Sequence, residues 1–543
     1  MKKIFLLFFI SALCINLFSQ ETLKSTEEEY YDFLALDGIT ERPTLGYRTL
    51  SDSVWNINPE KSHIWENNNL GNTFILWNSE NQGTNWFSKG FFHGIKLKVF
   101  GPEWFNSYNT EVPYGQYDGA LWQGKGYNSS FSTGIYLESY GFELTFKPQF
   151  SFSQNLAYDF LPGVFGNENS YFWGYGIDLV QRFGNKSFTN FDLGDTEIRY
   201  TFHTFTVGFG FQSPWLGPSY INPMLGSNNA PTYPKFDIGF RKTKLVIPGL
   251  NWYIGDFEAR IWIGQLTESD FFDNNDTLDK TLLNGFNISF TPSFWENFTI
   301  GVTKVCLTKW GNNFWKYINP FYDDNDINGI GEDQKASIYA VVLFPSVGFE
   351  IYGEIGIDDY ASDTLSVMKH TMIYTVGAKQ TFNISDKCKA LLLFEWNDFE
   401  MSQDFQLQWN YMGYYSHHQV KEGYTQKGQL LAGAYSYFGD SQLLKFELIF
   451  PKSSHALFIH RYCPDINYAY NIAVNNSAAN GALEPLYGIY HTFFTVGIKN
   501  NVFIQHSLLI QFEYNFIFVD HCLYEAKNIQ FSNRFTFNLK FNI

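Results

Sequence analysis

Apolar and polar residues alternate with a period of two along much of the chain. In the clearest run, positions 508, 510, 512, 514, 516 and 518 are Leu, Ile, Phe, Tyr, Phe and Phe, and polar Gln511, Glu513 and Asn515 stand between them. This period places one set of side chains on each face of a β-strand. The run is longer than an ordinary globular strand, and the same pattern recurs at 286–290 and 298–302. We therefore expect long strands with one apolar and one polar face.

The connections between these strands alternate in length. Long connections at 266–282, 309–334 and 359–370 are separated by short ones at 292–295, 345–346 and 383–386. Long loops at one end and short turns at the other are typical of outer-membrane barrels. One long connection, Tyr414–Gln426, falls on the side expected for short turns. Counting candidate strands gives roughly 18 to 20, and an even number is expected. Residues 91–543 are predicted to be all-β, as a transmembrane antiparallel β-barrel of about 18 strands with long extracellular loops. A soluble β-sheet protein is the alternative.

The N-terminal region has a different pattern. Met1-Lys2-Lys3 precedes an apolar run to Phe18, and Ser19-Gln20 offers a cleavage site, so residues 1–19 are predicted to be a signal peptide. Ser25-Thr-Glu-Glu28 is a capping box, and Gly38 ends the apolar pattern after it, which predicts a helix at Ser25–Asp37. Residues 20–90 carry neither period for long. They are predicted to be a periplasmic helical and irregular segment, packed against or into the barrel.

Composition supports the barrel and limits the partners. Aromatic residues make up 20% of the chain, yet mean hydropathy is only −0.22, because lipid-facing and lumen-facing residues average out. The net charge of −17 argues against a nucleic-acid partner. Cys306, Cys388, Cys463 and Cys522 show no CxxC spacing, so zinc is not expected and their pairing stays open. No nucleophile elbow G-x-S-x-G is present, and we do not expect an enzyme.

Two loops carry the residue types that bind carbohydrate, because sugars are recognised by flat aromatic faces and by planar amide or carboxylate groups. The first strand is predicted at about Ile95–Phe105. The loop after it supplies Trp104, Tyr114, Asp118, Trp122 and Gln123, and a second long loop supplies Trp215 and Asn228. These seven residues form the predicted carbohydrate-binding site. The alternative is that the same residues fold the two loops into the lumen as a plug.

A third loop contains half of a calcium-binding pattern. Asp324, Asp326 and Asn328 precede Gly329 as in the first half of a calcium loop. Lys335 stands where a complete loop needs a bidentate Glu. Calcium held by these three residues is one prediction, and an ordinary Asp/Asn/Gly-rich extracellular loop is the other. No other cofactor is expected.

A set of short motifs lies between Arg42 and Phe272. They are Gly101-Pro-Glu-Trp-Phe105, Tyr114-Gly-Gln-x-Asp-Gly-Ala-Leu-Trp-Gln-Gly-x-Gly126, Tyr140-Gly-Phe-Glu-Leu-x-Phe-Lys-Pro-Gln149, Asp195-x-Glu-Ile-Arg-Tyr200, Trp215-x-Gly-Pro218, Ser227-Asn-Asn-Ala230 and Ile254-Gly-x-Phe-Glu-Ala-Arg-Ile-Trp262. Together they resemble the Wzi-like capsule-assembly proteins. The resemblance implies an outer-membrane lectin that attaches or assembles capsular polysaccharide at the cell surface, without cofactor or catalysis.

The expected partners follow from this resemblance and from the barrel. They are surface or capsular polysaccharide, outer-membrane lipid, and the barrel-insertion machinery, which would read the terminal strand Phe535–Ile543. We expect a monomer. A porin or nutrient channel, built on the same barrel, is the alternative function.

Overall fold

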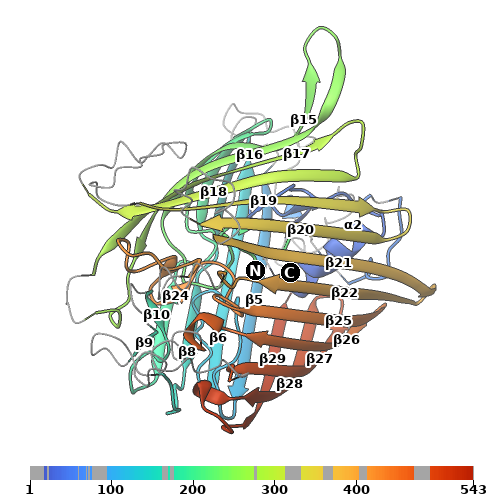
Figure 1. Cartoon of the computed structure of the whole chain (residues 1–543). Helices are drawn as coiled ribbons and strands as arrows, with labels where there is room; N and C mark the ends of the chain where they lie inside the picture. Colours follow the sequence, from blue (N-terminus) through green and yellow to red (C-terminus); the bar gives the residue numbers. More distant parts are fainter. Residues whose placement is uncertain are drawn as a thin grey trace, which may run out of the picture.

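A computed structural model gives the protein as a closed antiparallel β-barrel (Figure 1). The structure describes residues 18–20, 24–58, 60–68, 70, 74–75, 95–161, 169–171, 177–273, 278–311, 332–358, 371–402, 413–469 and 489–541. Most of residues 1–19 lie outside this set, and the signal peptide stays a prediction. Among the described residues, no helix is long and apolar enough to cross a membrane.

Eighteen strand positions close the barrel within the described part of the chain. The strands are β5 (Lys96–Asn109), β6 (Gly126–Ser139), β7 (Phe142–Phe146), β8 (Gln149–Ser153), β11 (Phe188–Asp192), β12 (Glu197–Phe202), β13 (Phe205–Gly210), β15 (Lys235–Ile247), β16 (Trp252–Thr267), β17 (Lys280–Pro292), β18 (Phe298–Lys309), β19 (Glu332–Phe344), β20 (Phe349–Asp358), β21 (Met372–Ser385), β22 (Cys388–Asp398), β25 (Asp440–Phe450), β26 (Ser453–Cys463), β27 (Thr492–Gln505), β28 (Leu508–Asp520) and β29 (Gln530–Phe541). Strands β7 and β8 follow one another along β6 and together occupy one strand position of the barrel. Strands β11 and β12 together occupy the next position in the same way. β29 pairs with β5 and closes the ring. The predicted barrel of about 18 strands is confirmed.

The period of two separates the lipid face from the lumen. On β28, Phe512 and Phe516 are exposed on the outer surface, whereas Asn515 is fully buried. Outward aromatic side chains pack against hydrocarbon, so the bilayer takes the place of a second protein layer. Inward polar side chains need partners inside the barrel, because burying an unpaired polar group is costly.

The structure corrects two predicted boundaries. The first strand extends to Asn109 rather than Phe105, so Trp104 lies within a strand and not in a loop. The long connection Tyr414–Gln426, which the sequence placed at the short-turn end, is part of a single connection, 399–439, between β22 and β25. Its described parts contain only the short pair β23 (Thr425–Gln426) and β24 (Gln429–Leu430). It therefore lies at the long-loop end, and the alternation of loop lengths is kept.

The N-terminal segment occupies the lumen near the short turns. Helix α2 (Thr26–Leu36) begins as predicted, with Ser25 as N-cap accepting a hydrogen bond from the Glu28 backbone N–H at 3.1 Å. Its acidic residues meet lysines on distant barrel strands: Glu27 contacts Lys540 at 2.9 Å, Glu29 contacts Lys445 at 3.3 Å, and Asp32 contacts Lys379 at 2.8 Å. These strands surround α2, which Figure 1 shows in blue inside the barrel. The helix is therefore held on several sides by the wall.

Two loops from the other end also enter the lumen. The connection 211–234 contains β14 (Trp215–Leu216), which pairs with β2 (Tyr47–Arg48) of the N-terminal segment. The connection 399–439 contributes a core of buried aromatic residues, including Tyr414, Tyr415 and Tyr424. The remaining short strands are β1 (Phe18–Gln20), β3 (Val54–Asn56), β4 (Phe74–Ile75), β9 (Ser170–Tyr171) and β10 (Leu179–Val180), with a 3-10 turn at Cys522–Tyr524. The described parts of these three segments therefore fill much of the lumen, together with the connection 110–125.

Candidate functional site

A cavity of about 340 Å³ remains inside the lumen, between the start of α2 and the inward loops. Its wall combines aromatic rings with polar and charged groups. The rings include Phe105, Tyr114, Tyr435 and Phe458. The polar groups include Gln116, Asp118, Gln149, Asn228 and Lys445. Pockets of this size are typical of small-ligand sites.

The two predicted sugar-binding loops meet at this cavity. Gly119 N–H donates to the Asn228 carbonyl at 2.9 Å, and Tyr117 N–H donates to Asn229 Oδ1 at 3.2 Å. Gly119 adopts φ +64, and a Cβ there would stand 2.7 Å from Gln149 Oε1. A glycine is therefore needed where the loop turns against the wall.

Three of the seven predicted residues line the cavity: Tyr114, Asp118 and Asn228. The Asn228 amide oxygen is buried and has no hydrogen-bond partner among the described residues. An unsatisfied buried acceptor is costly, so this oxygen is available to a ligand donor. These three predicted residues therefore lie together at one cavity, and their role in carbohydrate binding stays a prediction.

The other four predicted residues lie elsewhere. Gln123 is buried behind Asp118, and its Oε1 accepts hydrogen bonds from Ser107 and Arg534. Trp215 is also buried, with its ring 5.4 Å from Tyr117, and Trp122 packs edge-on against Phe183 at 5.2 Å. Trp104 faces outward and is 47% exposed on the barrel surface. The cavity is therefore supported by Gln123 and Trp215, and Trp104 points away from it.

Asp118 has an unusual electrostatic environment. Its carboxylate accepts a hydrogen bond from the Gln123 side chain. Burial raises the pKa of Asp118 to about 6, although the positive charge of Arg534 and the Gln123 hydrogen bond act in the opposite direction. Close to neutral pH the group can therefore exchange between accepting and donating hydrogen bonds.

Comparison with known proteins identifies the family. The family model for the capsule assembly protein Wzi matches residues 109–450. The chain belongs to the Wzi capsule assembly family. No curated protein sequence matches the chain.

The solved structure of Wzi shares the fold of this family member. The solved structure of Wzi from Escherichia coli, an outer-membrane protein involved in group 1 capsule assembly and described as a carbohydrate-binding β-barrel, is 12% identical, with a TM-score of 0.52. The match covers 82% of this chain and 85% of that one. OprB of Pseudomonas putida is 10% identical over 83% of this chain and 94% of its own, with a TM-score of 0.38. OccAB4 of Acinetobacter baumannii is 10% identical over 83% and 98%, with a TM-score of 0.42. The protein is an outer-membrane β-barrel.

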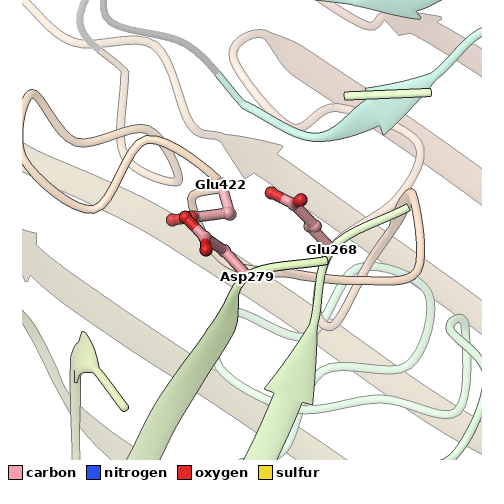
Figure 2. Close-up of side chains that lie close together, drawn as sticks. All are labelled: Glu268, Asp279 and Glu422. Atoms are coloured by element: carbon pink, nitrogen blue, oxygen red, sulfur yellow. The ribbon is translucent and has the colours of Figure 1, made fainter. Parts of the chain in front are cut away.

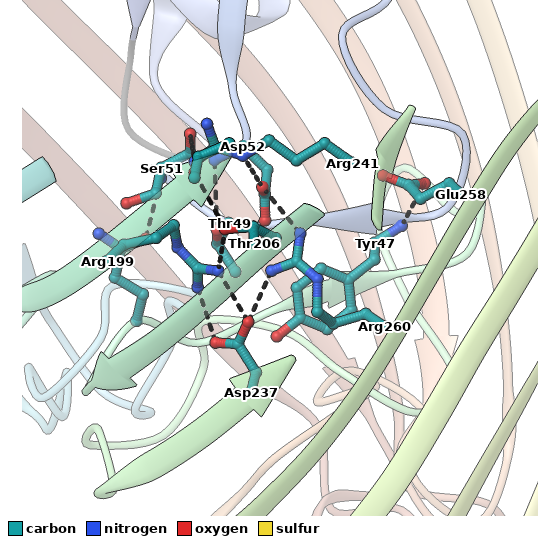
Figure 3. Close-up of polar contacts among 12 residues, drawn as sticks. Tyr47, Thr49, Ser51, Asp52, Arg199, Thr206, Asp237, Arg241, Glu258 and Arg260 are labelled. Atoms are coloured by element: carbon teal, nitrogen blue, oxygen red, sulfur yellow. Dashed lines mark hydrogen bonds and ion pairs between the residues drawn. The ribbon is translucent and has the colours of Figure 1, made fainter. Parts of the chain in front are cut away.

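A buried charge network holds the N-terminal segment of this Wzi-family barrel to the wall (Figure 3). Asp237 accepts hydrogen bonds from Arg199 at 2.7 and 2.8 Å and from Arg260 at 2.7 Å. Arg260 also reaches Asp52 of the N-terminal segment at 3.0 Å, as Arg241 does. Burial alone would raise the pKa of Asp52, but the attraction of Arg260 and Arg241 outweighs it and holds the pKa below its usual range. The network therefore holds the N-terminal segment in place inside the barrel.

Sequence reasoning missed several cavity residues because they lie on strands. Phe105 and Phe458 turn inward from β5 and β26, and Lys445 reaches the cavity from β25. An inward Phe interrupts the polar face of a strand, which is the signal that could have marked Phe105 and Phe458. Lys445 approaches Glu29 and Tyr220, from α2 and from the loop 211–234. No local pattern indicates such a three-way contact.

The predicted calcium ligands Asp324, Asp326 and Asn328 lie outside the described residues, and calcium binding there stays a prediction. Cys306, Cys388, Cys463 and Cys522 are all free thiols. The disulfide question, left open by the sequence, is answered for these four residues in this structure.

Proposed function

We propose that the protein attaches or assembles capsular or surface polysaccharide at the cell surface as a lectin-like outer-membrane barrel. The observation that carries the proposal is a barrel of the Wzi capsule assembly family whose filled lumen encloses a cavity of aromatic and amide groups. The proposed role is binding, with no catalytic step and no cofactor.

The chemistry of the cavity suits a sugar ring. Phe105 and Phe458 line the cavity, and aromatic rings make favourable contacts with the C–H groups of a pyranose. Asn228 offers an unpartnered amide oxygen to a sugar hydroxyl, and Asp118 offers a carboxyl that accepts or donates. Apolar ring faces combined with a few fixed polar groups are the usual construction of a small-ligand site.

An open channel is the alternative, and the lumen argues against it. α2 and the connections 211–234 and 399–439 pack across the interior. Such packing occupies the space that the water-filled path of a porin requires. Purified protein in planar lipid bilayers should therefore stay closed. A steady open conductance would favour the channel.

Binding can be tested with matched variants. Phe105→Leu combined with Phe458→Leu removes two ring faces from the cavity, while Phe131→Leu makes the same change on the lipid face, where Phe131 is exposed. Each aromatic ring contributes about 1 kcal/mol to the binding free energy. The double variant should therefore bind polysaccharide fragments from the cell that produces the protein about tenfold or more weakly than the wild type does. Isothermal titration of the detergent-solubilised protein measures this. Unchanged binding by the double variant would remove the cavity from the proposal.

The cellular role requires a separate assay. Deleting the gene should release polysaccharide into the medium while synthesis continues, and the wild-type gene should restore retention. Unchanged retention in the deletion strain would contradict the proposed function, whatever the purified protein binds.

A further inference from the structure

Three carboxylates meet at the long-loop end of the barrel (Figure 2). Glu268 follows β16, Asp279 precedes β17, and Glu422 belongs to the connection 399–439. One carboxylate oxygen from each residue lies within 4.8 Å of those of the other two. Figure 2 shows the three side chains turned toward one another from two separate parts of the chain. None of the three lines the sugar cavity described above.

Glu422 has a buried carboxylate oxygen without a hydrogen-bond partner among the described residues. Its side chain lies in a residue that is only 6% exposed, and its Oε2 atom is buried without a hydrogen-bond partner in the described part of the chain. A buried carboxylate that lacks a partner is costly. A cation placed between the three groups would remove this cost.

The carboxylates are positioned by contacts that do not involve the carboxylates themselves. Glu268 N–H donates to the Asp279 carbonyl at 3.2 Å, which aligns the two ends of the β16–β17 hairpin. The Glu422 carbonyl accepts hydrogen bonds from Asp178 N–H and from Thr425 Oγ, both at 2.9 Å. The backbone therefore brings the three acidic groups together despite their repulsion, as expected of a preformed ion site.

We propose that Glu268, Asp279 and Glu422 bind a calcium ion. Calcium takes six to eight oxygen ligands at about 2.3–2.6 Å, so two oxygens on the same ion lie at most about 5 Å apart. One oxygen from each of the three carboxylates lies within 4.8 Å of the other two, so a single ion can reach all three. The absence of nitrogen and sulfur ligands from the cluster favours a hard cation over zinc. Water molecules complete the coordination.

The ion would link two parts of the barrel. Glu268 and Asp279 belong to a hairpin of the wall, whereas Glu422 belongs to the connection that fills the lumen with Tyr414, Tyr415 and Tyr424. Calcium would therefore fasten this luminal connection to the rim. The proposed ligands are different residues from Asp324, Asp326 and Asn328, which lie outside the described residues, and the proposal does not depend on the proposed sugar binding.

The test uses the full chain in detergent after removal of metal with EDTA. Equilibrium dialysis with calcium should show a site that Glu422→Gln or Glu268→Gln weakens at least about tenfold, whereas Glu525→Gln, which changes an exposed loop carboxylate at the same end, leaves it unchanged. Calcium should raise the unfolding temperature of the wild type. Glu422→Gln in EDTA should already be more heat-stable than the wild type in EDTA, because it removes repulsion, and calcium should not stabilise it further.

Each other result overturns the proposal. A wild-type protein that binds no calcium shows that the three carboxylates do not form a calcium site. Binding by Glu422→Gln that equals the wild type excludes the cluster as the site. Loss of all binding in Asp324→Asn combined with Asp326→Asn, with Glu422→Gln unaffected, assigns the calcium to the other loop.

Discussion

Neutralising Asp237 is the sharpest perturbation of the buried charge network. In this network four cations, Arg199, Lys235, Arg241 and Arg260, face four carboxylates, Asp52, Glu143, Glu197 and Asp237. Asp237 is fully buried and contacts three of the cations. Asp237→Asn keeps the size of the side chain but leaves one positive charge in excess.

The expected cost follows from burial. Removing one partner of a buried ion pair costs about 3–5 kcal/mol, because the remaining charge stays desolvated. Asp195→Asn is the matched control: Asp195 pairs with Lys147 at 2.9 Å, but its side chain is 26% exposed. Water screens such a pair, so its loss should cost about 1 kcal/mol or less.

Urea unfolding of the protein in lipid vesicles measures both variants. Trp262 is buried on β16 beside Tyr47 of the N-terminal segment, so tryptophan fluorescence includes a reporter close to the network. The free energy of unfolding is obtained from the midpoint and the slope of the transition. If Asp237→Asn costs no more than Asp195→Asn, the network does not anchor the N-terminal segment, and the reasoning fails.

Two further predictions use the same unfolding assay. Ser25→Ala removes the N-cap of α2 and should lower the free energy of unfolding by about 1 kcal/mol, whereas no loss would mean that contacts with the wall alone hold the helix. The pKa of Asp118 is raised to about 6, compared with about 3.9 in an unfolded chain. The native state therefore holds this proton more tightly, and the stability from protonated Asp118 is lost as pH rises from about 4 to 6. Relative to Asp118→Asn, the wild type should be about 2–3 kcal/mol more stable at pH 4 than at pH 7; an equal difference at both pH values would contradict the raised pKa.

The sequence predicted those parts of the fold that depend on local pattern. A period of two placed the lipid face of β28, and the capping box placed the start of α2 at the observed residue. Both signals act over a few residues, where side-chain direction follows directly from backbone geometry. The count of candidate strands, roughly 18 to 20, came close as well, because each long alternating run marks one crossing of the bilayer.

Trp104 shows why only some of the predicted residues lie at the cavity. Phe100 and Ser107 both face inward and are buried, although they are an odd number of residues apart. A β-bulge between Phe100 and Glu103 adds a residue and switches the parity of β5. Gly101, at φ +69, provides the backbone conformation that the bulge requires. Trp104 therefore turns toward lipid, and Phe105 faces the lumen and lines the cavity.

The luminal contacts lay beyond local pattern because they depend on closure of the ring. Lys540 is the partner of Glu27, and Arg534 is the charge that acts on Asp118, yet each pair is separated by more than 400 residues. Strands β29 and β5 must pair before either contact exists. Since desolvation inside the closed barrel makes each unpaired charge costly, the acidic N-terminal helix and the inward lysines stabilise the same closed state. Folding of the N-terminal segment and closure of the barrel are therefore expected to be thermodynamically coupled.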